Sequence, residues 1–186
     1  MEFTFYILPE LVNGPYGGGN QFAKALKNHF VSRGMYGDSL EKSNVVIING
    51  FPFRDFSIFS KIFIWKLNAP DRIVLSRIDG PVSKIRHSKD SDKFDKAIFE
   101  FCNIASDGAI IQSNWSLQET IKHYAFKNNC PIEIISNSCN PAYFFKKKIT
   151  SKTKKKLSLI ATSWSTNPHK GFSTYKWLDS KINFNK

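Results

Sequence analysis

Three consecutive glycines stand between an apolar run and an amphipathic run near the start of the chain. Gly17, Gly18 and Gly19 follow the apolar run 3–8, and Asn20 closes the loop. Because glycine has no Cβ, the N–H groups at the start of a following helix are open to an anion, which the helix dipole also favours. The spacing is neither G-x-G-x-x-G nor a Walker loop. The pattern fits a phosphate site and equally a flexible connector.

Polar residues also follow two later apolar runs. Arg77 and Asp79 come after the run 72–76, and Asn114 follows the run 109–112. In an open parallel sheet, ligands bind outside the carboxyl ends of the strands. There an arginine can contact a phosphate and an aspartate can contact a sugar hydroxyl. Both segments also fit surface turns, the first of them with a local ion pair.

A further strand-to-helix junction lies near the end of the chain, after the apolar run 157–162, which predicts another strand. Lys170 and Gly171 stand just before an apolar helical pattern, where a lysine can pair with a diphosphate. The sequence has no Cys/His cluster at metal-ligand spacing and no G-x-S-x-G elbow. This argues against a metalloenzyme and a hydrolase, and we expect neither a metal nor another cofactor.

Short apolar runs alternate with amphipathic runs along most of the chain. The spacing predicts strands over residues 3–8, 45–48, 72–76, 109–112 and 132–135. Helical spacing predicts helices around residues 22–30, 56–67, 94–102 and 117–125. Gly34 is placed to end the first helix, and His29 falls on its apolar face, where we expect a core residue. The alternation predicts an α/β, Rossmann-like parallel sheet with helices on both faces.

The charge is concentrated in one segment. The net charge is +12, and residues 146–156 hold seven lysines and no acid, which leaves about +5 for the rest. A uniform nucleic-acid-binding face is therefore not indicated, and we expect no nucleic-acid partner. The segment fits a solvated linker, or a contact with anionic lipid head groups. We expect a first domain over 1–145, this linker over 146–156, and the start of a second Rossmann-like domain over 157–186.

Composition and cysteine usage are those of an ordinary globular protein. Hydrophobic residues make up 41% and charged residues 23% of the 186 residues. No run reaches the roughly 18 apolar residues that a membrane span requires. Cys102, Cys130 and Cys139 are an odd number without metal spacing. We therefore expect a reduced, cytoplasmic protein, with the lysine segment as its one candidate for peripheral contact with the inner membrane face.

Five segments, taken in order, resemble the family 4 glycosyltransferases of GT-B fold. They are GGGNQFAKAL, RIVLSRIDGP, AIIQSNWS, IISNSCNPAYF and IATSWSTNPHKGF. The resemblance implies two Rossmann-like domains that face each other across a cleft. The first binds the acceptor and the second binds the nucleotide sugar. It further implies sugar transfer with retention of configuration, with positive groups that stabilise the departing diphosphate.

The resemblance also implies roles for individual residues. It assigns contact with the donor phosphates to the three glycines and to Lys170 with Gly171, and it places Asn137 at a strand end before the interdomain linker. Ser76 stands where the family often has a histidine. The resemblance implies an N-terminal half of a GT-B enzyme, whose acidic E-x7-E element would come from a missing domain or a separate chain. The acceptor implied is a glycan, a lipid-linked sugar or another molecule. The alternative is a non-catalytic module that binds a sugar phosphate or an anionic membrane surface.

Overall fold

The computed structural model describes seven stretches of the chain. They are residues 2–13, 17–49, 57–86, 90–127, 129–138, 160–161 and 170–182. The chain divides into two units, residues 1–140 and 141–186, and each is described by itself. The lysine segment 146–156, nearly all of the predicted strand 157–162, and Cys139 lie outside the described residues.

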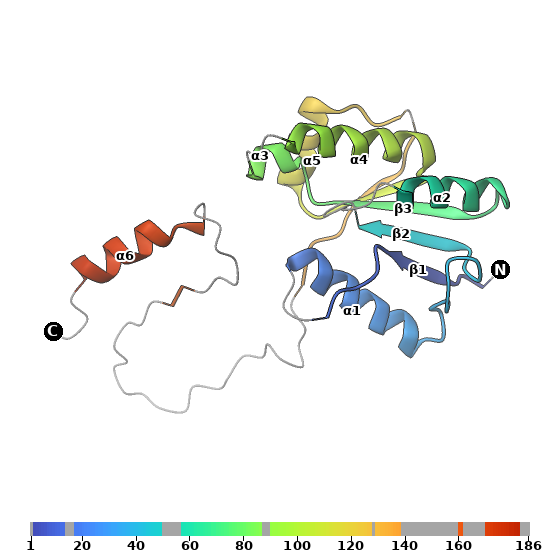
Figure 1. Ribbon diagram of the computed structural model, residues 1–186, viewed down its shortest axis with the longest axis horizontal. Helices are drawn as coiled ribbons and strands as arrows, with labels where there is room; N and C mark the ends of the chain where they lie inside the picture. The colour runs from blue at the N-terminus through green and yellow to red at the C-terminus, as the bar shows by residue number, and fades with distance from the viewer. Residues whose placement is uncertain are drawn as a thin grey trace. The chain divides into compact units, whose positions relative to one another are not determined.

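The first unit is built on a five-stranded parallel sheet (Figure 1). Its strands are β1 (Phe5–Leu8), β2 (Val45–Asn49), β3 (Ile73–Ile78), β4 (Gly108–Ile111) and β5 (Ile132–Ile134), side by side in that order. All four pairings are parallel. The predicted α/β fold with a parallel sheet is therefore confirmed.

The segments that follow β1 pair with its two different edges. After α1 (Gly18–Ser32), the backbone makes a single parallel bridge between Tyr36 and Phe5. The Phe5 N–H donates to the Met35 carbonyl at 2.7 Å, and the Gly37 N–H donates to the Phe5 carbonyl at 2.9 Å. The chain then crosses to β2, on the other edge of β1. Such a reversal is the point at which open α/β sheets form a ligand crevice, outside the carboxyl ends of the strands.

Helices cover both faces of the sheet, as the alternation of apolar runs predicts. Ile7 and Ile47 face α1, where they pack with Ala23. Val46 and Ile48 face the opposite way, because successive side chains of a strand alternate between faces. That second face is covered by α2 (Ser57–Leu67), α4 (Ser91–Ala105) and α5 (Asn114–His123), and Figure 1 shows α1 and α2 on opposite sides of the strands.

The expectation for His29 is wrong, since its side chain is exposed. Helix α1 packs on the sheet through Ala23, Leu26 and Phe30. The Phe30 ring stacks on Phe5 with centroids 4.0 Å apart. His29 precedes Phe30 by one residue, a rotation of about 100° around the helix, which turns it to solvent.

A short helix, α3 (Val82–Arg86), was not predicted. The Asp95 carboxylate, fully buried, accepts hydrogen bonds from the N–H groups of Val82 at 2.7 Å and Ser83 at 2.9 Å. These bonds satisfy two of the donors that every helix start leaves open, and the negative charge suits the helix dipole. Asp95 lies 13 residues from Val82 in the sequence, so no local pattern announces the helix.

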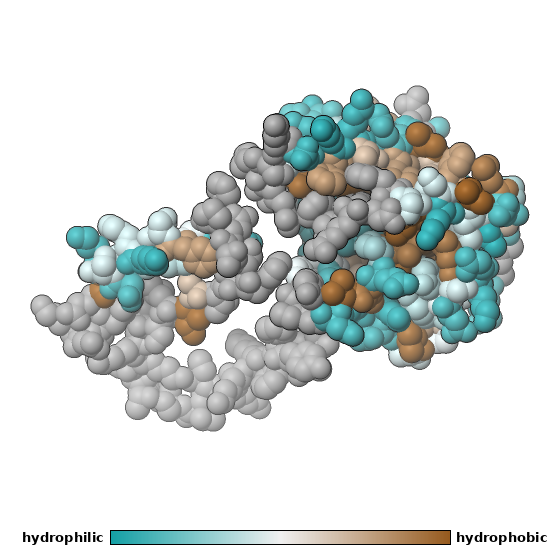
Figure 2. Space-filling model, in the orientation of Figure 1, coloured by the Kyte–Doolittle hydropathy of each residue, from teal (hydrophilic) through white to brown (hydrophobic). Residues whose placement is uncertain are grey.

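The described part of the second unit contains one helix, α6 (Phe172–Lys181), where the sequence predicts it. None of its residues is buried, and Trp177 is 58% exposed. Within the described stretches, no helix has the length and apolar character needed to cross a bilayer. Figure 2 shows apolar residues, in brown, set among hydrophilic ones on the visible surface.

Gly34 ends α1 as predicted, and its substitution gives a test of the fold. Its φ is +67°, its N–H donates to Val31, and the next N–H, of Met35, donates to Phe30. A Cβ added there meets nothing within 4 Å. Gly34→Ala should therefore destabilise the protein by about 1 kcal/mol through the backbone conformation alone. Gly34→Asn should cost less, because asparagine tolerates this conformation.

The measurement is the free energy of unfolding in urea for the wild type and the two variants. An alanine variant as stable as the wild type would contradict this helix end.

The buried Cys102 gives a second test. Burial raises the pKa of its thiol to about 11 from an ordinary value of 9.0. Since the folded-state pKa is the higher one, the stability contributed by the neutral thiol is complete below pH 9 and is lost as the pH rises toward 11.

The enclosure of Cys102 can also be tested by labelling. In a Cys139→Ser background, Cys130, which is partly exposed, should react with a thiol reagent at pH 8 far faster than Cys102.

Unfolding free energies measured between pH 8 and 11 should show this loss, and Cys102→Ala should lack it. Equal labelling rates for Cys102 and Cys130 would show that the thiol is not enclosed as described.

Candidate functional site

A buried guanidinium lies at the carboxyl end of the sheet. Arg77 is part of β3, which extends two residues beyond the predicted run, and the residue is 1% exposed. Arg77 and Leu75 are two residues apart and share the α1 face of the sheet. The Arg77 guanidinium carbon lies 4.4 Å from the centroid of the Phe22 ring of α1. A positive charge is thus enclosed between the end of the sheet and the first turns of a helix.

Arg77 binds side chains from three other strand ends and from its own. Its Nη1 donates to Asn49 Oδ1 at 2.5 Å and pairs with Asp79 Oδ1 at 2.5 Å. Its Nη2 donates to Asn137 Oδ1 at 2.9 Å and to Gln112 Oε1 at 3.3 Å. Asn137 Nδ2 also donates to Gln112 Oε1 at 3.1 Å. We call these five residues the Arg77 cluster; they join the ends of β2, β3, β4 and β5.

One donor of the Arg77 cluster is left over. Arg77 Nε is buried and has no hydrogen-bond partner within the described part of the chain. A buried N–H without an acceptor costs about 1–3 kcal/mol, so such groups are usually paired. An oxygen atom of a ligand or a water molecule would satisfy it.

Burial governs the electrostatics of the Arg77–Asp79 pair. It raises the pKa of the Asp79 carboxyl, and the neighbouring guanidinium opposes that rise. Burial likewise lowers the pKa of Arg77, against the opposing effect of Asp79. Because the two charges offset each other, the Arg77 cluster presents amide dipoles and hydrogen-bonding groups rather than net charge. Groups of this kind suit hydroxyl-bearing ligands.

The start of α1 lies directly against the Arg77 cluster. Gly17 is the N-cap residue, with φ +43°. Because glycine has no side chain, the N-cap residue makes no side-chain hydrogen bond to this helix start. A Cβ on Gly19 would lie 2.9 Å from Asn49 Nδ2 and 3.6 Å from Arg77 Nη1, whereas one on Gly18 would lie 3.7 Å from Asn137 Nδ2. Gly19 is therefore required for the helix to approach the cluster. From the sequence alone, this packing role could not be told apart from a role in the approach of a ligand. The first turn also carries no acidic residue, which leaves its N–H groups suited to an anion.

The other predicted site residues lie elsewhere. Asn20 holds the preceding loop: Val12 N–H donates to Asn20 Oδ1 at 3.1 Å, and Asn20 Nδ2 donates to the Val12 carbonyl at 2.9 Å. Asn114 is the first residue of α5, exposed, and the described contacts do not join it to the Arg77 cluster. Lys170 and Gly171 belong to the second unit, where Gly171 is the N-cap of α6 with φ +79°.

Three residues of the site were missed by the sequence analysis: Asn49, Gln112 and Phe22. Asn49 is the last residue of β2, and Gln112 directly follows β4. The rule that identified Arg77, namely polar residues at the carboxyl ends of strands, would have found both amides. Phe22 gave no such signal, because it matches the helical spacing of an ordinary core residue.

Ser76 lies on the other face of the sheet from Arg77. It is 3% exposed, and its hydroxyl is 2.6 Å from that of Ser106. It packs beneath α4 and has no part in the Arg77 cluster. Among the described residues, no group of three or more His, Cys, Asp or Glu side chains is placed to hold a metal ion.

Comparison with known proteins gives no match: neither a protein-family model, nor a curated protein, nor a solved structure matches this chain. The Arg77 cluster at the carboxyl end of the sheet is therefore the feature on which a functional assignment rests. The bridge to Tyr36 is at Phe5, the first residue of β1, whereas Asn49 and Arg77 are paired at the carboxyl end of their strands.

Removal of the guanidinium should test its structural role. Arg77→Met leaves Asp79 partly buried without a cation and removes the guanidinium donor of the Asn49 and Asn137 amide oxygens, so we expect a loss of about 3 kcal/mol in unfolding free energy. Arg77→Met combined with Asp79→Asn should recover part of the loss, because the unpaired charge is gone. Lys122→Met, which breaks the exposed pair with Glu119, should change stability little.

Urea unfolding of these variants measures the differences. Equal losses for Arg77→Met and Lys122→Met would mean that the guanidinium does not hold the strand ends together.

Proposed function

We propose that this protein acts in sugar transfer, as part of a retaining glycosyltransferase of GT-B type that uses a nucleotide sugar. One observation carries the proposal. A polar cluster with a buried guanidinium lies at the carboxyl edge of a parallel sheet, against a helix start whose first two residues are glycines. The resemblance of the ordered motifs to family 4 glycosyltransferases gives the same assignment.

The two parts of this site suit the two parts of a nucleotide sugar. The N–H groups and dipole of the first turn of α1 favour the diphosphate, whose negative charge increases as the bond to the sugar breaks. The amide groups of Gln112 and Asn137 offer donors and acceptors to sugar hydroxyls. Lys170, in the second unit, is by resemblance a further cation for the diphosphate.

A binding module without catalysis is the second candidate. The only carboxylate of the Arg77 cluster, Asp79, is paired with Arg77 and is therefore not free to act as a base. A protein that only binds a sugar phosphate requires no such base. If the lysine segment 146–156 instead binds anionic vesicles, replacement of its lysines with glutamine should abolish that binding.

Binding of a nucleoside diphosphate tests the proposed phosphate site. Calorimetric titration of the whole chain with UDP, GDP and ADP should show binding of at least one of them. Gly19→Ala should weaken it by about tenfold, since its Cβ would displace the Asn49 side chain at the helix start. Gly18→Ala should weaken it less, because its Cβ makes only an ordinary contact.

Glu100→Gln, on the exposed side of α4, should leave nucleotide binding unchanged. Binding that ignores the Gly19 substitution would place the nucleotide elsewhere. Release of nucleoside diphosphate from the matching nucleotide sugar, dependent on an added acceptor, favours the transferase. Binding by the natural protein without any release favours the binding module.

A further inference from the structure

Helix α2 is apolar on its outward side as well as on the side that packs in the core. Ile62 and Trp65 are buried in the core. On the other side, Phe63 is 42%, Ile64 58% and Leu67 64% exposed. These three side chains lie between about 100° and 160° around the helix from Ile62. A surface helix ordinarily carries polar residues there, so the outward side of α2 is poorly suited to water.

A fourth apolar side chain extends this surface from α4. The Phe59 ring of α2 stacks on Phe101 of α4 with centroids 4.2 Å apart. Ile104 follows Phe101 by three residues, nearly one helical turn, and is 69% exposed. Figure 2 shows apolar residues, in brown, over α2 and the neighbouring end of α4. We call Phe63, Ile64, Leu67 and Ile104 the α2 patch.

The charges beside the α2 patch complement an anionic surface. Helix α2 carries Lys61 and Lys66 and no acidic residue. Lys61 is exposed and makes no ion pair with a described residue. Asp107 pairs with Lys66, and Glu100 of α4 pairs with Lys96, so neither carboxylate adds net negative charge. Since the whole chain carries +12, anionic lipid head groups would attract it.

The size and place of the α2 patch argue against other occupants. Four side chains exposed by 42–69% give an apolar surface on the order of a few hundred Å². A stable dimer buries about 800 Å² on each partner, and a second copy would also set lysines against lysines. The Arg77 guanidinium lies on the α1 face of the sheet, and α2 covers the opposite face. A ligand of the Arg77 cluster therefore does not cover the α2 patch.

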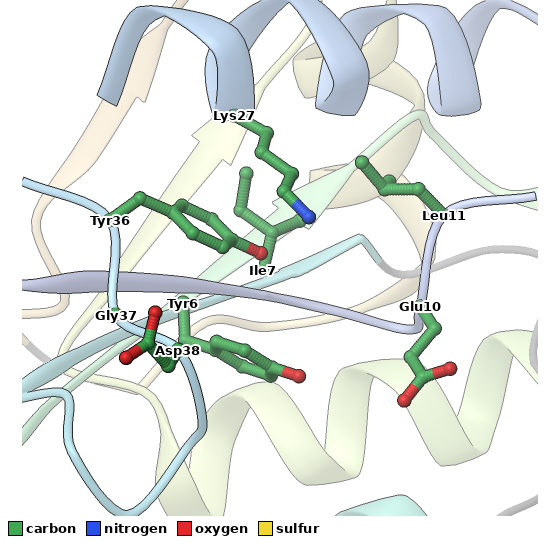
Figure 3. A pocket seen from close by; sticks show the side chains of 8 residues that line it. All are labelled: Tyr6, Ile7, Glu10, Leu11, Lys27, Tyr36, Gly37 and Asp38. Atoms are coloured by element: carbon green, nitrogen blue, oxygen red, sulfur yellow. The ribbon is translucent and has the colours of Figure 1, made fainter. Parts of the chain in front are cut away.

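The hollow beside β1, about 480 Å³ in volume, offers no comparable surface. Figure 3 shows Lys27 and Tyr36 on one side of β1, and Tyr6 and Glu10 on the other. Its lining carries charges of both signs and does not enclose a single space. It defines no ligand class, whereas the α2 patch combines apolar side chains with a single sign of unpaired charge.

We propose that the α2 patch docks on the surface of a bilayer that contains anionic lipids. Its apolar side chains enter the boundary between head groups and acyl chains, and Lys61 extends to the level of the head groups. The strength of such binding rises with the apolar area buried and with the attraction to anionic lipids. The proposal does not rest on sugar transfer, because it requires neither a nucleotide nor a reaction.

The test is flotation of the whole chain with vesicles of phosphatidylcholine, alone or with about half phosphatidylglycerol, at about 0.1 M and 0.5 M NaCl. The wild type should bind the anionic vesicles more tightly. Ile64→Gln combined with Leu67→Gln should weaken this binding about tenfold at both salt concentrations, because salt screens charge but not apolar contact. Val31→Gln combined with Ile121→Gln, which replaces two apolar residues of similar exposure on other helices, should bind as the wild type does.

A second series carries glutamine in place of the seven lysines of residues 146–156, so that this segment does not mask the α2 patch. In that background Lys61→Glu should weaken binding at about 0.1 M NaCl and matter less at about 0.5 M. This variant keeps the apolar side chains, so it tests the proposal even if the double glutamine variant does not fold. Urea unfolding checks the stability of each variant.

Three results would overturn the proposal. The first is a wild type that does not bind anionic vesicles at the lower salt concentration. The second is a double glutamine variant that folds and binds as the wild type does in both series. The third is light scattering that shows a dimer which Ile64→Gln with Leu67→Gln converts to a monomer, since this would assign the α2 patch to a second copy of the chain.

Discussion

The buried guanidinium of Arg77 is the interaction on which the functional edge of this protein depends. It has four hydrogen-bond or ion-pair partners, and each of them lies at the end of a different strand. The Arg77 side chain therefore fixes the relative positions of the strand ends from β2 to β5. Removal of a guanidinium from water costs several kcal/mol, and apolar side chains at this place would give as much stability. A buried guanidinium with polar partners differs from apolar side chains in that it keeps this edge of the sheet polar while also holding it in one conformation.

The same interaction explains the glycines at the start of α1. A helix approaches a polar cluster closely only when its first turn carries no side chains toward it, and Gly19 leaves room for Asn49 that a Cβ would take. The ring of Phe22, one turn further, covers the guanidinium. The helix start and the strand ends therefore lie together, with the amide side chains of the cluster on one side and the N–H groups of the first helical turn on the other.

The sequence was sufficient where the signal is local and insufficient where it is not. Apolar runs of four to six residues predicted all five strands, and the left-handed conformation at Gly34 followed from its place after the first helix. The short helix α3 depends on Asp95, a partner distant in sequence, and a single bridge at Tyr36 marks the passage of the chain along the outer edge of β1. For the same reason Asp79 and Asn137 were placed near strand ends but not joined to Arg77, and Asn49 and Gln112 were missed, because these contacts depend on the register of neighbouring strands.

The sheet separates the two proposed sites. The Arg77 guanidinium lies on the face that α1 covers, whereas α2 covers the opposite face and carries its patch on the side turned away from the strands. A helix with its side chains is about 10–12 Å across, so a bilayer on the α2 patch would be held at least that far from the strands. Because the two sites share no residue, attachment to a bilayer and binding of a nucleotide at the carboxyl edge can occur at once.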